Sequence, residues 1–278
     1  MPLPDKHKRP RWRLEDIEFD KIDVSLARDD EFLFLTLASA SFVEILSETY
    51  SDNLVELFKD NSKVTAWLDQ SWQHEEVQHG KALKAYVRAV WPEFDWDRGH
   101  DEFKVQYNAV CTVEQLESKP GLELVARCVV ETGTSTFYRA LHDYVREPVL
   151  RQLIDNIRTD EAAHYTHFRR HFAAYNKVER HGVREVLATM WRRLRDARGE
   201  DVYIAFKHVY GQRHPEKPFV EEDWQAYNRT VKRLARRYYP YKMAVKMLIK
   251  PIPMMEPLKR VLQWPLLGLV MLVSAGRT

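Results

Sequence analysis

Apolar side chains recur with helical spacing over most of the first two thirds of the chain. They predict four long helices, at about residues 30–59, 62–91, 120–145 and 148–175. The first contains a segment, Phe32 to Ser47, that is apolar or small on every side, as in a buried helix. Pro92 ends the second, and Pro148 suits the first position of the fourth. An irregular connection with one short helix is expected between the second and third.

Two of these apolar segments each hold a single acidic residue. Glu44 is the one charge between Glu31 and Glu48, and Glu131 is the one charge between Arg127 and Arg139. A lone carboxylate is costly to bury unless something compensates it. Glu44 could be matched to an arginine or be protonated, but a metal ligand is the interpretation we favour, because of the motifs on the other two helices.

Those motifs are two Glu-x-x-His pairs, Glu76 with His79 and Glu161 with His164. On a helix this spacing puts a carboxylate and an imidazole on one face. Two such pairs and two single glutamates form the ligand set of a dinuclear carboxylate bundle. The gaps between successive glutamates are 32, 55 and 30 residues, which suit two pairs of antiparallel neighbours joined by a long crossover. Four carboxylates would also neutralise two divalent metal ions.

Residues beside the motifs are expected to have supporting or structural roles. Glu75 points about 100° away from Glu76 and is predicted to lie at the surface or to support a ligand. His74 is predicted to be hydrogen-bonded or exposed, and His167 is predicted to support a ligand or to be structural. Gly133, with hydroxyl residues around it, indicates either close helix packing or room for a small molecule or oxygen beside Glu131, and both can hold.

Composition sets broader limits. Hydrophobic residues make up 45% of the chain, charged residues 30%, and the net charge is +2, which is typical of a soluble protein with a substantial core. Nine glycines are few and favour helices over turn-rich sheets. The two cysteines form neither a metal motif nor a disulfide framework, and no signal sequence or spanning segment is evident, so a cytoplasmic location is expected.

The C-terminal third is basic. Residues 179–260 carry 19 Lys and Arg against 10 Asp and Glu, a net +9, whereas the rest of the chain carries −7. This charge predicts either a solvated face or a surface for an acidic partner or an anionic membrane, and nucleic acid is excluded because no recognised motif accompanies it. The apolar tail from Leu258 to Val273 could lie on a membrane, on the bundle or on a second subunit.

The motifs resemble those of the ferritin-like superfamily, and within it the soluble acyl-[acyl-carrier-protein] desaturases and their bacterial relatives. The family motif Glu-Glu-x-x-His-Gly stands here at residues 75–80, and its motif Asp-Glu-x-x-His at residues 160–164. The family also has a threonine three residues after the third-helix glutamate, here Thr134. The resemblance covers residues 30 to 175. It departs at Gln78, where the family usually has arginine, and in a shorter connection between the first two helices.

The predicted fold class is therefore all-α, a ferritin-like four-helix bundle with additional C-terminal helices. The predicted division is an N-terminal arm at 1–28, a di-metal bundle at 29–177 and a basic helical extension packed on it at 178–278. The predicted metal ligands are Glu44, Glu76, His79, Glu131, Glu161 and His164. Either Glu131 or Glu161 would bridge the metals, Asp160 would hold a ligand histidine, and Thr134 would deliver protons.

The resemblance implies a di-iron oxidase that uses O₂ to oxidise an unactivated C–H bond, by desaturation or hydroxylation, in an acyl chain or similar small molecule. It implies an external electron donor such as a ferredoxin, an acyl-carrier protein that presents the substrate, and a homodimer. The alternatives are a ferritin-like protein that handles iron without an organic substrate, a di-manganese or Mn/Fe oxidase, since these ligands accept each metal, and a structural protein that has kept the bundle.

Overall fold

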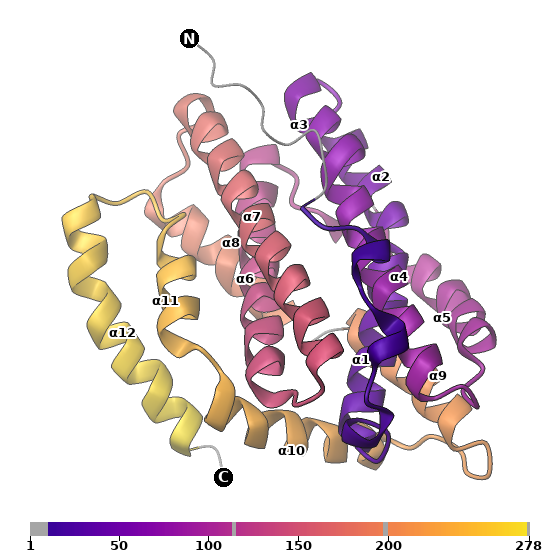
Figure 1. Ribbon diagram of the computed structural model, residues 1–278. Helices are drawn as coiled ribbons and strands as arrows, with labels where there is room; N and C mark the ends of the chain where they lie inside the picture. The colour runs from indigo at the N-terminus through magenta and orange to yellow at the C-terminus, as the bar shows by residue number, and fades with distance from the viewer. Residues whose placement is uncertain (1–10, 113–114, 197–199, 277–278) are drawn as a thin grey trace. The chain divides into compact units, whose positions relative to one another are not determined.

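The computed structural model describes residues 11–112, 115–196 and 200–276, and over these ranges the chain is helical and contains no strand (Figure 1). The chain forms two compact units, each assembled from three separate segments. Unit 1 comprises Met1–Val113, Arg146–Asn156 and Asp201–Ala226. Unit 2 comprises Glu114–Val145, Ile157–Glu200 and Tyr227–Thr278. The predicted all-α class is confirmed for the described residues.

The predicted N-terminal arm lies in unit 1, and its residues 1–10 fall outside the described part. The remainder forms three short 3₁₀ turns, η1 (Leu14–Asp16), η2 (Phe19–Lys21) and η3 (Val24–Leu26). The first two turns contact α4 (Gln73–Val90). Trp12, Ile17 and Ala27 are buried, so this segment is anchored by apolar side chains at intervals along its length.

The first long helix is bent, which the sequence did not predict. Asp30 caps α1 (Glu31–Ile45) by accepting a hydrogen bond from the Leu33 N–H at 2.9 Å, and most of α1 is buried, as its apolar sequence predicts. At Leu46 the chain has φ −86° and ψ 9°, and the Leu46 N–H donates to the Val43 carbonyl, three residues back. The helix resumes as α2 (Ser47–Leu57), bent by 40°. The prediction of one continuous helix from 30 to 59 is therefore wrong, because the helix is interrupted at Leu46.

The second predicted helix is present from residue 62 to residue 90, with one local irregularity. It consists of α3 (Ser62–Trp67), a π-helical turn η4 (Leu68–Trp72) and α4. A π turn adds a residue to one helical turn and shifts the side chains after it around the axis, and such turns are frequent at functional sites. Here it directly precedes the segment that carries Glu76 and His79, so it sets the face on which they lie.

The glycine of the first motif marks the closest approach of α1 and α4, which pack along each other. A Cβ placed on Gly80 would lie 2.5 Å from the Ile45 side chain and 2.6 Å from the Ile45 backbone nitrogen. Any larger residue must push the backbone of α1 away at the bend. Gly80 is therefore required by the packing beside Glu44.

The rest of unit 1 consists of α5 (Trp96–Val110), the first turns of α7 (Pro148–Glu179), α9 (Glu200–Arg213) and the start of α10 (Glu221–Tyr238). The aromatic side chains after α4 pack into the core. The Phe94 ring lies edge-on to Phe34, and the Trp96 ring lies edge-on to Phe42. Glu147 is fully buried and caps α7, since it accepts hydrogen bonds from the Leu150 N–H at 2.7 Å and the Tyr86 hydroxyl at 3.1 Å.

Unit 2 contains α6 (Pro120–Tyr144), most of α7, α8 (Val183–Asp196), the end of α10, α11 (Tyr241–Ile249) and α12 (Glu256–Gly276). Its helix α6 packs against α8 and α11, and α11 packs against α12. The predicted third helix matches α6 within one residue, and α7 extends one turn beyond the predicted end at residue 175.

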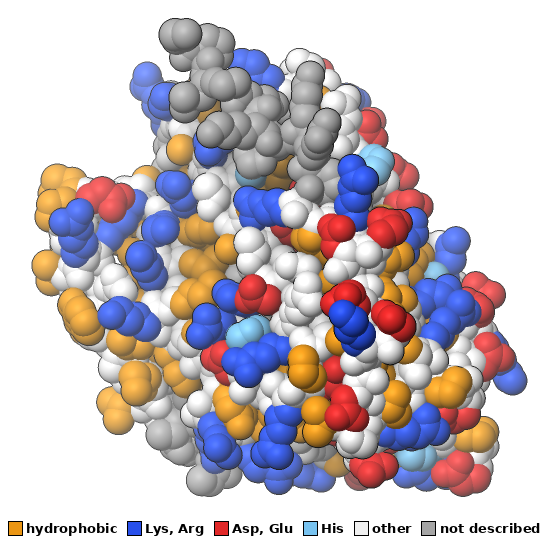
Figure 2. Space-filling model, viewed as in Figure 1, with side chains coloured by type: hydrophobic (Ala, Val, Ile, Leu, Met, Phe, Trp, Pro, Cys, Tyr) orange, Lys and Arg blue, Asp and Glu red, His pale blue; other side chains and the backbone are white. Residues whose placement is uncertain are grey.

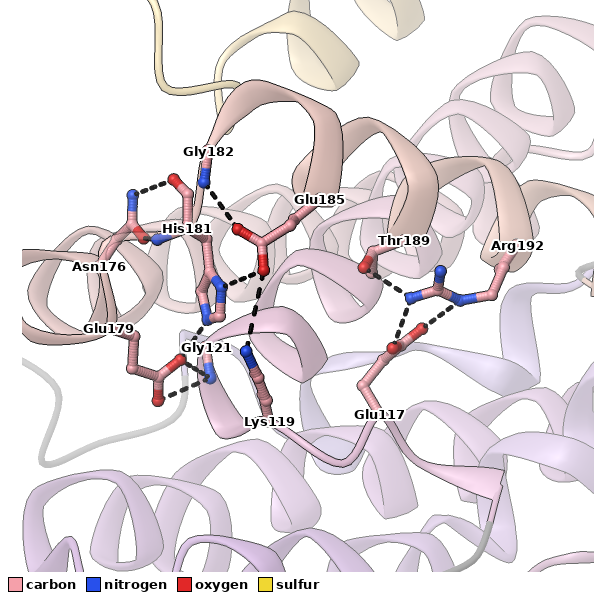
Figure 3. Close-up of polar contacts among 10 residues, drawn as sticks. All are labelled: Glu117, Lys119, Gly121, Asn176, Glu179, His181, Gly182, Glu185, Thr189 and Arg192. Atoms are coloured by element: carbon pink, nitrogen blue, oxygen red, sulfur yellow. Dashed lines mark hydrogen bonds and ion pairs between the residues drawn. The ribbon is translucent and has the colours of Figure 1, made fainter.

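The turn between α7 and α8 is held by ionic hydrogen bonds, as Figure 3 shows. The buried His181 ring lies between Glu179, at 2.5 Å from Nε2, and Glu185, at 3.4 Å from Nδ1. Glu179 also accepts from the Gly121 N–H at 3.1 Å, at the start of α6. Arg180 has a positive φ of 56°, the left-handed conformation that commonly follows the end of a helix. These contacts fix the start of α6 to the end of α7.

Gly80→Ala is expected to destabilise the protein by about 1–3 kcal/mol, because the added methyl group overpacks the contact with Ile45. Urea unfolding measures the change in the free energy of unfolding. Gly211→Ala in α9 is the control, since a Cβ there meets nothing within 4 Å and alanine should stabilise the helix by about 0.5–1 kcal/mol. Equal effects of the two changes would contradict the packing role of Gly80.

Candidate metal centre

Unit 1 brings three of the predicted ligands together. Glu44, Glu76 and His79 each offer one ligand atom, and these atoms lie within 4.8 Å of one another. Nδ1 of His79 is 3.6 Å from a carboxylate oxygen of Glu76. His79 is fully buried and Glu76 nearly so, whereas Glu44, at the bend of the first helix, is half-buried. This cluster could hold a metal ion.

The N-terminal segment covers the histidine of this cluster. The Trp12 ring stacks on the His79 ring with parallel planes and 6.1 Å between the centroids. The Gln78 side-chain amide donates a hydrogen bond to the Trp12 carbonyl at 3.1 Å. Gln78, where the resembled family usually has arginine, thus holds the segment that places Trp12 over His79. The sequence places Trp12 in the N-terminal arm, but no periodic pattern links it to the motif of Glu76 and His79.

Unit 2 contains a second cluster of the same composition. Glu131 on α6 and Glu161 and His164 on α7 each offer one ligand atom, again within 4.8 Å of one another. Nδ1 of His164 lies 3.9 Å from Glu131 and 4.0 Å from Glu161. All three side chains are buried, with at most 2% of any residue exposed.

Thr134 is directly connected to this second cluster. Its hydroxyl donates a hydrogen bond of 2.6 Å to Oε2 of Glu161. A Cβ built on the neighbouring Gly133 meets nothing within 4 Å in the described part of unit 2, and this glycine is exposed, so close helix packing is not seen there. The sequence therefore located a threonine that touches a candidate ligand, although its role in proton delivery stays a prediction.

Two ionisable side chains of unit 2, Cys128 and Tyr239, have raised pKa values. Burial, with a further contribution from the Glu131 carboxylate, raises the pKa of the Cys128 thiol one turn earlier on α6, so this side chain is a thiol at neutral pH. Burial also raises the pKa of Tyr239, whose hydroxyl lies 3.1 Å from that of Thr136. Neither side chain adds charge to the cluster.

The other candidates take positions consistent with lesser roles. His74 is exposed and its Nδ1 lies 2.9 Å from the Asp69 carbonyl. Glu75 and His167 are half-buried. Asp160 is buried beside Glu161, and its predicted contact with a ligand histidine stays a prediction.

The donor sets fit divalent transition metals. Each cluster combines two carboxylates with one imidazole, oxygen and nitrogen ligands that iron, manganese and zinc all accept. Two ionised carboxylates and a neutral imidazole carry a charge of −2, which one divalent cation neutralises. A divalent metal ion would fit the charge and the ligand types of each cluster.

Comparison of the chain with models of known families, with curated proteins and with solved structures gives no match. Membership of the ferritin-like superfamily therefore stays a prediction from the motifs.

Glu76→Ala and Glu161→Ala are each expected to lower the metal content of the purified protein from about two ions per chain to about one or fewer, because each removes a ligand that its cluster needs. Elemental analysis after expression in iron-rich medium gives the content. Glu75→Ala is the matched control and should retain the wild-type value. Wild-type protein that contains almost no metal under these conditions would contradict the ligand assignment.

Proposed function

We propose that the protein is a ferritin-like di-metal oxidase, in which the six residues of the two clusters bind two iron ions and O₂ oxidises an unactivated C–H bond. The observation that carries the proposal is the pair of buried clusters, each with two carboxylates and one histidine from a Glu-x-x-His motif. The order and spacing of these six residues along the sequence match the ligand set of a dinuclear carboxylate protein, which supports the proposal.

Bound iron would supply the redox chemistry and the affinity for O₂. The protein residues supply position, exclusion of water and control of protons. The near-complete burial of Glu131, Glu161 and His164 keeps bulk water away from the ligands. Trp12 and Gln78 fix the orientation of the His79 ring in the other cluster.

Thr134 is the residue best placed to control a proton. Its hydroxyl lies 2.6 Å from Oε2 of Glu161, within ordinary hydrogen-bond distance. A threonine can donate this proton and accept another from the side of Gly133, where the space is open. This arrangement favours an oxidase over an iron store, because storage needs no hydroxyl group poised on a ligand.

The substrate class we propose is an acyl chain or a similar small molecule, free or linked to an acidic carrier protein, with electrons from an external donor. Iron handling without an organic substrate, and manganese or mixed Mn/Fe occupancy, are the alternatives. The location that we propose for this activity is the cytoplasm.

Among the described helices, none alone is long and apolar enough to cross a membrane. The bent pair α1 and α2 together has the length and apolar composition of a membrane span. Core helices can have these features too, and most of α1 is buried.

Thr134→Val is expected to slow O₂ consumption by reduced, iron-loaded protein by about 100-fold, the lower end of the usual contribution of a positioned proton donor. Thr134→Ser retains the hydroxyl and should retain most of the rate. Oxygen uptake is followed with an electrode, and iron content is measured on the same samples. A Val variant as fast as wild type would remove Thr134 from the mechanism, and accumulation of many irons per wild-type chain as a mineral would favour storage.

A carrier-linked substrate should depend on the exposed basic side chains at the end of α10. Reversal of Arg233, Arg236 and Arg237 to Glu is expected to raise the apparent KM for such a substrate by about tenfold or more and to leave metal content unchanged. Turnover of the same acyl chain without its carrier should change little. Equal KM values for the triple variant and wild type would show that these arginines form only a solvated face.

A further inference from the structure

Helix α12 presents large apolar side chains to solvent along almost its whole described length. Exposed large hydrophobic residues on it and just before it are Met255, Leu258, Val261, Trp264, Leu266, Leu269, Val270, Met271 and Leu272. Figure 2 shows hydrophobic side chains gathered over this helix, with lysine and arginine side chains beside them. Soluble proteins rarely expose a contiguous apolar patch larger than a few hundred Å² unless it binds something.

The exposed side chains are not confined to a narrow stripe. At about 100° per residue, Leu258, Leu269 and Leu272 project in similar directions, whereas Trp264 and Met271 project more than a quarter turn away from Leu258. From Trp264 to Leu272 the helix contains no polar or charged side chain. α12 packs on α11, so its apolar surface extends around most of the circumference that α11 leaves open.

A row of positive charge runs beside this apolar helix. Lys242, Lys246 and Lys250 follow one another at helical spacing on and just after α11, and all three are exposed. Lys242 also lies 5.5 Å from the centre of the Trp264 ring, within cation–π distance. Helix α11 has no acidic residue, so the row is not neutralised from within its own helix.

The start of α12 extends the positive charge. Its one acidic residue, Glu256, forms an ion pair of 2.9 Å with Lys259, and Arg260 follows. Partial desolvation of the Lys250 side chain, and next repulsion from Lys246 and Arg169, lower the pKa of Lys250.

We propose that α12 and the lysine row of α11 form an in-plane anchor that docks on an anionic phospholipid bilayer. The helix has 21 residues and is therefore about 30 Å long, and it would lie flat with its apolar side chains among the acyl chains. The lysines would then face the lipid phosphates, each contributing favourably near an anionic surface.

A second copy of the chain is a less suitable occupant of this surface. Symmetric pairing of two α12 helices would bring two lysine rows toward each other, and like charges in an interface are unfavourable. Such pairing would also cover a stripe, whereas the exposed apolar side chains spread over a wide arc. This inference is independent of the oxidase proposal, since it concerns neither metal cluster.

Vesicle sedimentation with the full chain tests the anchor. The protein is expected to co-sediment with vesicles of phosphatidylcholine and phosphatidylglycerol and to bind pure phosphatidylcholine far more weakly. Binding should fall as salt rises, because the screening length shortens from about 10 Å at 0.1 M to about 3 Å at 1 M. Failure to bind anionic vesicles at low salt would overturn the proposal.

Two pairs of variants separate the apolar and the charged contributions. Trp264→Ala is expected to weaken binding to the anionic vesicles by about tenfold, through loss of one large apolar side chain from the lipid. Trp191→Ala on α8 is the matched control, because the two tryptophans are similarly exposed, at 64% and 68%. Reversal of Lys242 and Lys246 to Glu should abolish the preference for anionic lipid, whereas reversal of Lys81 and Lys104, which are exposed in unit 1, should change it little.

Measurements of folding and of oligomeric state on wild type and variants complete the test. All the substituted side chains are exposed, so circular dichroism and thermal unfolding should match wild type. Loss of binding in the Lys81 and Lys104 variant equal to that in the Lys242 and Lys246 variant would overturn the assigned surface. So would a wild-type dimer that Trp264→Ala converts to a monomer without any change in vesicle binding, since a second copy would then cover α12.

Discussion

The free-energy cost of burying carboxylates is the main constraint on how the helices of this protein pack. Each cluster holds two carboxylates and an imidazole with ligand atoms within 4.8 Å of one another. At that separation two negative charges repel strongly in a poorly polarisable interior, and a bound cation would offset this repulsion. Such a cation would also stabilise the folded protein, because whatever binds the folded chain preferentially shifts the folding equilibrium towards it.

Three other acids in the chain, of which Glu123 and Glu147 are buried and Glu179 is partly exposed, are compensated by hydrogen bonds and ion pairs within the polypeptide. Glu123 forms a buried ion pair of 2.8 Å with Arg127 one turn later on α6. Glu147 receives the Tyr86 hydroxyl and backbone N–H groups at the start of α7. Glu179 is matched by His181 and the first turn of α6. These three acids lie at helix ends, as do Glu44 and Glu76 of the first cluster, whereas Glu131 and Glu161 of the second cluster lie in the middle of α6 and α7.

The sequence predicted what depends on local pattern and missed what depends on tertiary packing. The limits of α6, and of the continuous helix from α3 to α4, follow from periodicity and prolines, and so does the grouping of Glu161 with His164 one turn apart. The bend at Leu46 and the π turn before Gln73 leave no such pattern, because the residues there are ordinary helix formers. The stacking of Trp12 on His79 joins residues 67 positions apart, and its partners could be identified only in space.

The order in which segments of the chain contribute to the two units has a consequence for biosynthesis. Each unit is built from three separated segments, and the last segment of unit 1 ends at Ala226. During translation α1 and α4 emerge early, yet unit 1 cannot be completed until α9 has left the ribosome. Helical surfaces of unit 1 that are buried in the folded protein stay exposed for that interval, in which chaperones can protect them. Neither unit is one contiguous fragment, so truncation of the chain from its N-terminus removes part of unit 1, and truncation from its C-terminus removes part of unit 2.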